Sequence, residues 1–169
     1  EIRQLTKKYG SLLLLDGAQS TGQIPLDMAA MDCDFYSMPG QKWLLGPEGV
    51  GGLFIRRDLI DRVEPVFVSS WAAKPSDDPY SFEPNPSTID KLLLSSTSAA
   101  LQAGLLAAIG FVQEIGIDRI EQRNLDLAGL MKEALAETPR VRLISPLNRN
   151  SSSGLVSFAV QGVDPTDVV

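Results

Sequence analysis

One short segment near the start of the chain limits the fold more than any other feature. Residues 11–15, SLLLL, form an almost continuous apolar run, and Asp16 and Gly17 close it. A strand without polar alternation is typical of a parallel sheet that is covered on both faces. The run therefore predicts a strand buried on both faces of a layered α/β domain.

The rest of the chain alternates segments of strand and helix character. Strands are expected at residues 34–38, 51–56, 141–144 and 155–160, and helices at residues 58–63, 98–112 and 117–136. This alternation favours a layered α/β fold. Residues 69–90 carry four prolines and are expected to form a long loop, which is usually functional or mobile.

The two long helices differ in their apolar pattern. Residues 98–112 are apolar nearly all round, which predicts a helix that is buried or covered by a partner subunit. Residues 117–136 carry a single apolar stripe, which is typical of a helix that packs one side on the core. The stripe consists of Ile117, Ile120, Leu127, Leu130, Met131 and Leu135.

Composition excludes several functional classes. The longest apolar stretch, residues 99–112, is too short for a transmembrane helix, so no membrane partner is expected. The net charge of -6 argues against sequence-independent nucleic-acid binding, which needs a basic surface. The chain has one cysteine, which is typical of a reducing, cytoplasmic protein. It has no histidine, so it cannot supply a Ser–His or Cys–His pair or a His-based metal site.

Both ends of the sequence resemble truncated helices. The first residues resemble the last turns of a helix that stops at Gly10, and residues 164–167 resemble a helix start. Only two residues follow that start, too few for a stable helix. We therefore expect the chain to be an internal fragment of a longer protein.

Three features that could take part in catalysis or ligand binding lie in the first third of the chain. Residues 16–19, DGAQ, follow the first strand, Lys42 follows the second, and residues 46–52 form a glycine-rich turn. Ligands of open α/β sheets bind at the carboxyl ends of strands. An acid and a lysine there suit pyridoxal 5'-phosphate, because the amine can form a Schiff base and the carboxylate can keep the pyridine nitrogen protonated.

Each of these features also has an ordinary structural interpretation. An aspartate that closes a strand is more often a turn residue, and a lysine beside a tryptophan is usually a surface residue. The glycine-rich turn does not have the spacing of a phosphate loop. Trp43 could line a substrate pocket or simply pack in the core.

Residues 15–57 closely resemble the class V aminotransferases, and the match extends more loosely over almost the whole chain. Asp16, Gln19, Lys42 and the Gly46–Pro47 pair fall in the order and spacing of that family. The family comprises fold-type I pyridoxal phosphate enzymes, among them cysteine desulfurases, cysteine C–S lyases and isopenicillin N epimerase-like proteins. The resemblance implies a mostly parallel, layered α/β/α cofactor-binding domain followed by a smaller α+β domain.

The resemblance implies a role for each of three residues on the cofactor ring. Lys42 would carry the internal aldimine and later move a proton at the substrate α-carbon. Asp16 would pair with the pyridine nitrogen, and Gln19 would donate a hydrogen bond to the phenolic oxygen.

The resemblance also implies phosphate contacts. Gln41 takes the position of a phosphate-binding histidine found in most desulfurases, and its amide can still donate. Pro39 takes the position of a phosphate-binding serine, for which Ser37 could compensate. Thr97 lies in a motif that reaches the phosphate of the partner subunit, although simple N-capping of the following helix is the plainer interpretation.

The resemblance finally implies an organisation and an activity. We expect residues 1–115 to belong to the large cofactor-binding domain and residues 116–169 to a linking helix and the start of the small domain. The predicted protein is a homodimeric desulfurase or C–S lyase acting on an amino acid, with cysteine favoured. Class V aminotransferase or epimerase activity, or a cofactor-free scaffold, remain the alternatives.

Cys33 could carry a persulfide, but two aspartates flank it, so a small buried residue is favoured.

Overall fold

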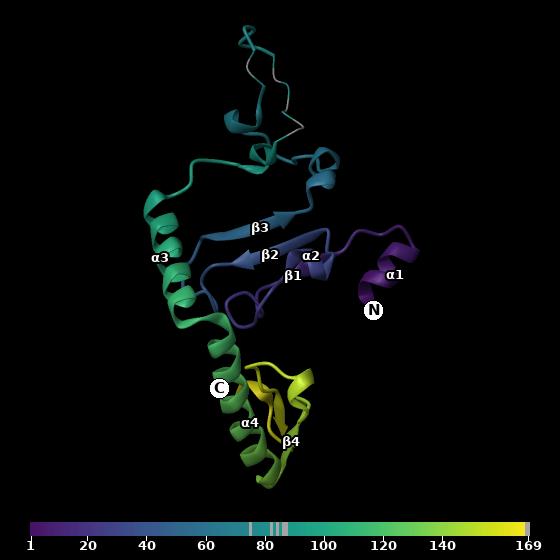
Figure 1. Ribbon diagram of the computed structural model, residues 1–169, viewed down its shortest axis with the longest axis vertical. Helices are drawn as coiled ribbons and strands as arrows, with labels where there is room; N and C mark the ends of the chain where they lie inside the picture. Colours follow the sequence, from purple (N-terminus) through teal and green to yellow (C-terminus); the bar gives the residue numbers. More distant parts are fainter. Residues whose placement is uncertain (75, 82, 84, 86–87, 168–169) are drawn as a thin grey trace.

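The computed structural model describes residues 1–74, 76–81, 83, 85 and 88–167. Figure 1 shows an elongated molecule with one sheet near its middle, α3 beside one end of that sheet, and α4 leading away from it. The helices are α1 (Ile2–Lys8), α2 (Met28–Met31), α3 (Ala99–Ile115) and α4 (Ile117–Glu137). The strands are β1 (Leu14–Asp16), β2 (Phe35–Pro39), β3 (Gly51–Ile55), β4 (Val141–Leu143) and β5 (Phe158–Val160). Short 3₁₀ segments are η1 (Arg57–Arg62), η2 (Ser70–Ala72), η3 (Ile89–Leu92), η4 (Arg149–Ser151) and η5 (Pro165–Asp167).

The first sheet has the strand order β1-β2-β3. Strand β1 runs parallel to β2, with Asp16 opposite Ser37, and β3 runs antiparallel to β2, with Gly51 opposite Pro39. The carboxyl ends of β1 and β2 therefore lie at the same edge of the sheet as the start of β3. This edge brings together the segments around Asp16, Ser37 and Lys42.

The core of this sheet contains Leu13, Cys33 and Tyr36, each at most 8% exposed. The predicted burial of residues 11–15 is seen on one face only within the described residues: Leu13 and Leu15 lie in or against the core, whereas Leu14 is 59% exposed. Coverage of the second face stays a prediction. The run does form a strand, which starts at Leu14.

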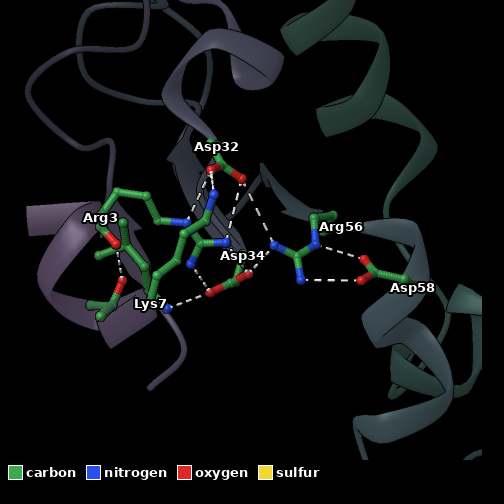
Figure 2. Close-up of polar contacts among 8 residues, drawn as sticks. Arg3, Lys7, Asp32, Asp34, Arg56 and Asp58 are labelled. Carbon is green, nitrogen blue, oxygen red and sulfur yellow. Dashed lines mark hydrogen bonds and ion pairs between the residues drawn. The ribbon is translucent and has the colours of Figure 1, made fainter. Parts of the chain in front are cut away.

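A buried carboxylate joins α1 to the sheet (Figure 2). The Asp34 side chain is 1% exposed and accepts hydrogen bonds from the backbone N–H of Leu13 (2.7 Å) and from Arg3 (2.8 Å). Arg56, directly after β3, forms an ion pair with it at 2.6 Å. Burial by itself raises the pKa of a carboxyl, but these three partners outweigh it and hold the pKa of Asp34 below its usual value.

A second, more exposed acid extends this network. Asp32 is bound by Lys7 and lies 3.3 Å from Arg3. Hydrogen bonds from Lys7 and then from Arg3 lower the pKa of Asp32 to about 2. Arg56 also binds Asp58 of η1 at 2.6 Å. The charged groups therefore connect α1, the start of β2 and the end of β3 (Figure 2).

Helix α3 is capped by Ser98, whose hydroxyl accepts a hydrogen bond from the N–H of Leu101 at 3.4 Å. Its predicted burial does not occur within the described chain, where Val112 is its one buried residue and Leu106 is 71% exposed. Coverage by a partner subunit stays a prediction. Among the described helices none alone is long and apolar enough to cross a membrane, although α3 and α4 together meet that length and composition and are bent by 77° at their junction.

Helix α4 packs against β4 of the antiparallel pair β4–β5, through a side that includes only half of the predicted stripe. Ile117, Ile120 and Leu135 are half-buried, whereas Leu127, Leu130 and Met131 are 45–64% exposed, and the buried residues are Ala128 and Lys132. Burial of Lys132 is possible because its ammonium donates to the backbone oxygen of Pro146 (2.9 Å) and to Ser152 (2.6 Å). The buried side of the helix therefore overlaps the apolar stripe only in part and also contains a lysine. The predicted domain boundary at residue 116 coincides with the bend but stays a prediction.

Candidate active site

An open hollow of about 700 Å³ lies at the edge of the sheet where β1 and β2 end. Four of the predicted site residues line it, namely Asp16, Ser37, Gln41 and Lys42. The rest of its wall comes from Ala18, Met38, Pro39 and residues 49–53. Chain topology thus collects an acid, an amine, an amide and a hydroxyl around one cavity.

Asp16 is held in place through one of its two carboxylate oxygens. Its Oδ1 accepts hydrogen bonds from the backbone N–H of Ala18 (2.8 Å) and from the hydroxyl of Ser37 (3.4 Å). The first bond closes the turn that the sequence Asp–Gly favours. Within the described residues Oδ2 makes no hydrogen bond, so it can accept a proton donor from the hollow. The hydroxyl of Ser37, predicted to bind phosphate, is directed to Asp16 here.

Close backbone approaches bring the segment of Lys42 to the turn after Asp16. Gly22 has a φ of +87°, and a Cβ there would lie 2.5 Å from the carbonyl of Trp43. Only glycine allows this conformation together with this contact. The loop is closed by hydrogen bonds from Gly46 N–H to Gly40 (2.8 Å) and from Leu45 N–H to Lys42 (3.0 Å).

Helix α3 supports the same loop from outside. The Cδ1 atom of Leu105 would lie 2.8 Å from a Cβ at Gly46 and 3.0 Å from one at Gly40. The glycines therefore let the helix press directly on the backbone of the loop. Leu45 adopts a φ of +61°. This backbone conformation is strained for any residue that has a Cβ, and such strain is common in loops that carry function.

Gln19 and Thr97, the other two predicted site residues, are not part of the wall of the hollow. The Oε1 atom of Gln19 accepts a hydrogen bond from the indole N–H of Trp43 at 2.9 Å. The hydroxyl of Thr97 accepts one from Gln102 at 2.8 Å, next to the start of α3. The role of Thr97 toward a partner subunit stays a prediction.

Two other reactive side chains have ordinary structural surroundings. Cys33 is 1% exposed in the core beside Leu13 and Tyr36, which confirms the interpretation as a small buried residue. Lys74, outside the hollow, forms an ion pair with Glu83 at 3.1 Å.

Sequence reasoning missed the contacts behind the Gln19 side chain. Gln23 is 1% exposed, donates to the backbone oxygen of Gln19 (3.0 Å) and accepts from the N–H of Gly154 (2.8 Å). A Cβ at Gly154 would lie 3.2 Å from the indole of Trp43. No motif signals a contact between residues 131 positions apart.

Comparisons with known proteins agree over most of the chain. The family described as "Aminotransferase class-V" matches residues 1–169. A "Probable cysteine desulfurase" from Halalkalibacterium halodurans is 31% identical over 99% of this chain and 40% of its own length. The chain thus spans about two fifths of this curated relative.

Solved structures share the fold. The apo cysteine desulfurase of Thermococcus onnurineus NA1 matches with a TM-score of 0.83 and 30% identity over 98% of this chain and 40% of that protein. The cystine C–S lyase C-DES, in complex with its reaction product cysteine persulfide, gives 0.76 and 29% over 89% of this chain and 39% of that protein. A C-DES mutant with glycine covalently linked to its PLP-cofactor gives 0.75 and 28% over the same shares. These matches confirm the layered α/β fold predicted from the sequence.

Proposed function

The chain belongs to the class V aminotransferase family, and from that premise we propose that it forms part of a pyridoxal phosphate-dependent enzyme that cleaves a C–S bond of cysteine or a closely related amino acid. The observation that carries the proposal is the hollow in which Asp16 and Lys42 meet at one sheet edge. The named activity of the Halalkalibacterium halodurans relative and the product bound to C-DES support the choice of substrate.

The residues of the hollow fit this cofactor by their chemistry. Asp16 keeps Oδ2 without a partner among the described residues, as a protonated ring nitrogen requires. Lys42 brings a primary amine, and Gln41 brings an amide that donates to a phosphate oxygen. The volume of about 700 Å³ lies in the range of ordinary cofactor sites.

Each residue then has a defined task. When bound, the cofactor supplies an aldehyde that amines can attack and a ring that accepts electrons from the substrate α-carbon. Lys42 would hold the aldehyde carbon, and its amine, once free, would take the α-proton. Asp16 would keep the ring nitrogen protonated. Gln19, whose Oε1 accepts the hydrogen bond from Trp43, would donate its Nε2–H to the phenolic oxygen.

The proposal extends to assembly and location. Exposed apolar side chains on α3, such as Leu106 and Phe111, support a homodimer, in which Thr97 would face the phosphate of the other copy. A single, buried cysteine supports a cytoplasmic location. Transamination and epimerisation would begin with the same residues, so product analysis separates them from C–S cleavage.

The test uses the full-length polypeptide that carries this sequence. We expect a visible absorbance band on addition of pyridoxal phosphate and, after borohydride reduction and peptide mapping, a pyridoxyl adduct on Lys42. Lys42→Ala should abolish the adduct, whereas Lys74→Ala, which alters an exposed ion pair, should retain it. A missing band, or an adduct elsewhere, refutes the proposal and favours a scaffold. With cysteine we expect sulfide or persulfide as the product, and a keto acid without released sulfur would refute C–S cleavage.

A further inference from the structure

A chain of contacts connects the loop before β5 to the side chain of Gln19. The N–H of Gly154 donates to Oε1 of the buried Gln23 at 2.8 Å, and Nε2 of Gln23 donates to the backbone oxygen of Gln19 at 3.0 Å. The indole of Trp43 lies against Gly154, because a Cβ there would be 3.2 Å from its Cη2 atom. The same indole donates to Oε1 of Gln19 at 2.9 Å.

Helix α4 fixes the loop that contains Gly154. Lys132, which is 3% exposed, donates to the backbone oxygen of Pro146 and to the hydroxyl of Ser152. Ser152 in turn donates to the backbone oxygen of Asn148 at 2.7 Å. The loop therefore has a defined position on α4, and its glycine gives the indole of Trp43 a fixed surface to pack on.

The hydrogen bond from the Trp43 indole fixes the orientation of the Gln19 side-chain amide. An indole N–H can only donate, so its partner must be the amide oxygen. The amide nitrogen, which is a donor, is then left on the opposite side. Without Trp43 the amide could rotate by half a turn, because its oxygen and nitrogen ends are almost the same in shape. The hydrogen bond removes this freedom.

We propose that Trp43 is a positioning residue that keeps Gln19 as a hydrogen-bond donor to the cofactor, and that the loop of residues 146–154 holds Trp43 in place. This inference rests on the proposed function. It makes the electronic state of the cofactor depend on a loop packed on α4. A donor at the phenolic oxygen stabilises its deprotonated form, so loss of the donor makes proton loss from the bound cofactor harder.

The first test compares Trp43→Phe, Gln19→Ala and the double variant in the full-length polypeptide loaded with pyridoxal phosphate. The readouts are the dissociation constant of the cofactor and the pH midpoint of its visible absorbance. Trp43→Phe should weaken binding about 2- to 10-fold, the range of one neutral hydrogen bond, and raise the midpoint. The double variant should equal Gln19→Ala, because the tryptophan acts through Gln19.

Two further variants cover the case in which Trp43→Phe fails to fold. Gln19→Glu keeps an acceptor for the indole but has no donor, so it should raise the midpoint. Gly154→Ala places a methyl group against the indole and should shift the midpoint in the same direction as Trp43→Phe. Gly129→Ala on α4 is the matched control, since its Cβ has no atom within 4 Å, and it should leave the midpoint unchanged.

The outcomes separate this inference from the proposed function. A wild-type protein that carries cofactor on Lys42, together with an unchanged midpoint in Trp43→Phe and Gly154→Ala, overturns the inference alone. Additive effects of Trp43→Phe and Gln19→Ala also overturn it, because they assign Trp43 a packing role only. A wild-type protein without cofactor refutes the proposed function, and the inference with it.

Discussion

Replacing Asp34 by asparagine should destabilise the fold around α1 by about 3 kcal/mol. The carboxylate is 1% exposed and lies within 2.8 Å of Arg3, Arg56 and the backbone N–H of Leu13. Breaking a buried ion pair from one side costs about 3–5 kcal/mol, because the partner charge is left uncompensated. Arg3 and Arg56 are 16% and 34% exposed and keep part of their hydration, which places the cost at the lower end.

Asparagine keeps an oxygen for the N–H of Leu13, whereas alanine does not. Asp34→Ala should therefore cost about 1 kcal/mol more than Asp34→Asn, the lower bound for one unpaired buried donor. The assay is native-state hydrogen exchange of the Leu13 amide in the full-length polypeptide, combined with urea unfolding. Both variants should accelerate exchange at this amide, and alanine should have the larger effect.

Asp58→Asn is the matched control. Its carboxylate is 65% exposed and binds the same Arg56, so the change in stability should be small. Two results would refute the reasoning about Asp34. The first is a stability of Asp34→Asn within about 0.5 kcal/mol of the wild type, which is the usual range for surface substitutions. The second is an equal cost for Asp58→Asn, which would show that exposure does not govern the effect.

Two further predictions concern pH and backbone geometry. The pKa of Asp32, lowered to about 2 by Lys7 and Arg3, lies below its unfolded value, so its stabilisation is complete above about pH 5 and is lost as the pH falls toward 2. Urea midpoints measured from pH 6 to 2 should fall less steeply in Asp32→Asn; an unchanged slope would contradict this. Gly22→Ala combines a φ of +87° with a backbone contact of 2.5 Å and should cost about 2–4 kcal/mol in urea unfolding and weaken cofactor binding. Gly110→Ala, whose Cβ meets open space, should not, and equal costs for both would disprove the steric argument.

Much of the candidate site could be predicted from local order along the chain. Asp16 and Lys42 each follow a strand, and parallel strands end at the same sheet edge, so their meeting in one hollow follows from the pattern. The task of Ser37 was harder to predict, because its hydroxyl is directed to Asp16 by the register of two strands. No sequence motif indicates that the Trp43 indole donates to Gln19.

The expectations about burial that hold only in part have a common physical cause. An apolar pattern indicates which side of an element could be buried and not what covers it. Among the described residues Leu14 is left exposed, and α4 buries Lys132 beside half of its predicted stripe. The ammonium of Lys132 can be buried because it donates hydrogen bonds to a backbone oxygen and a hydroxyl.

Local patterns along the chain predict where most of the long elements lie, where helices stop near Gly10 and Gly116, and the order of the groups at the sheet edge. They miss α2 and place the start of β5 three residues too early. The correctly predicted features depend on side chains and backbone conformations within a few residues of each other. Packing of distant segments is needed to show that Asp34 joins α1 to the sheet and that Trp43 donates a hydrogen bond to Gln19. Such contacts join residues 24 to 31 positions apart, and packing brings them together at distances that no local pattern encodes.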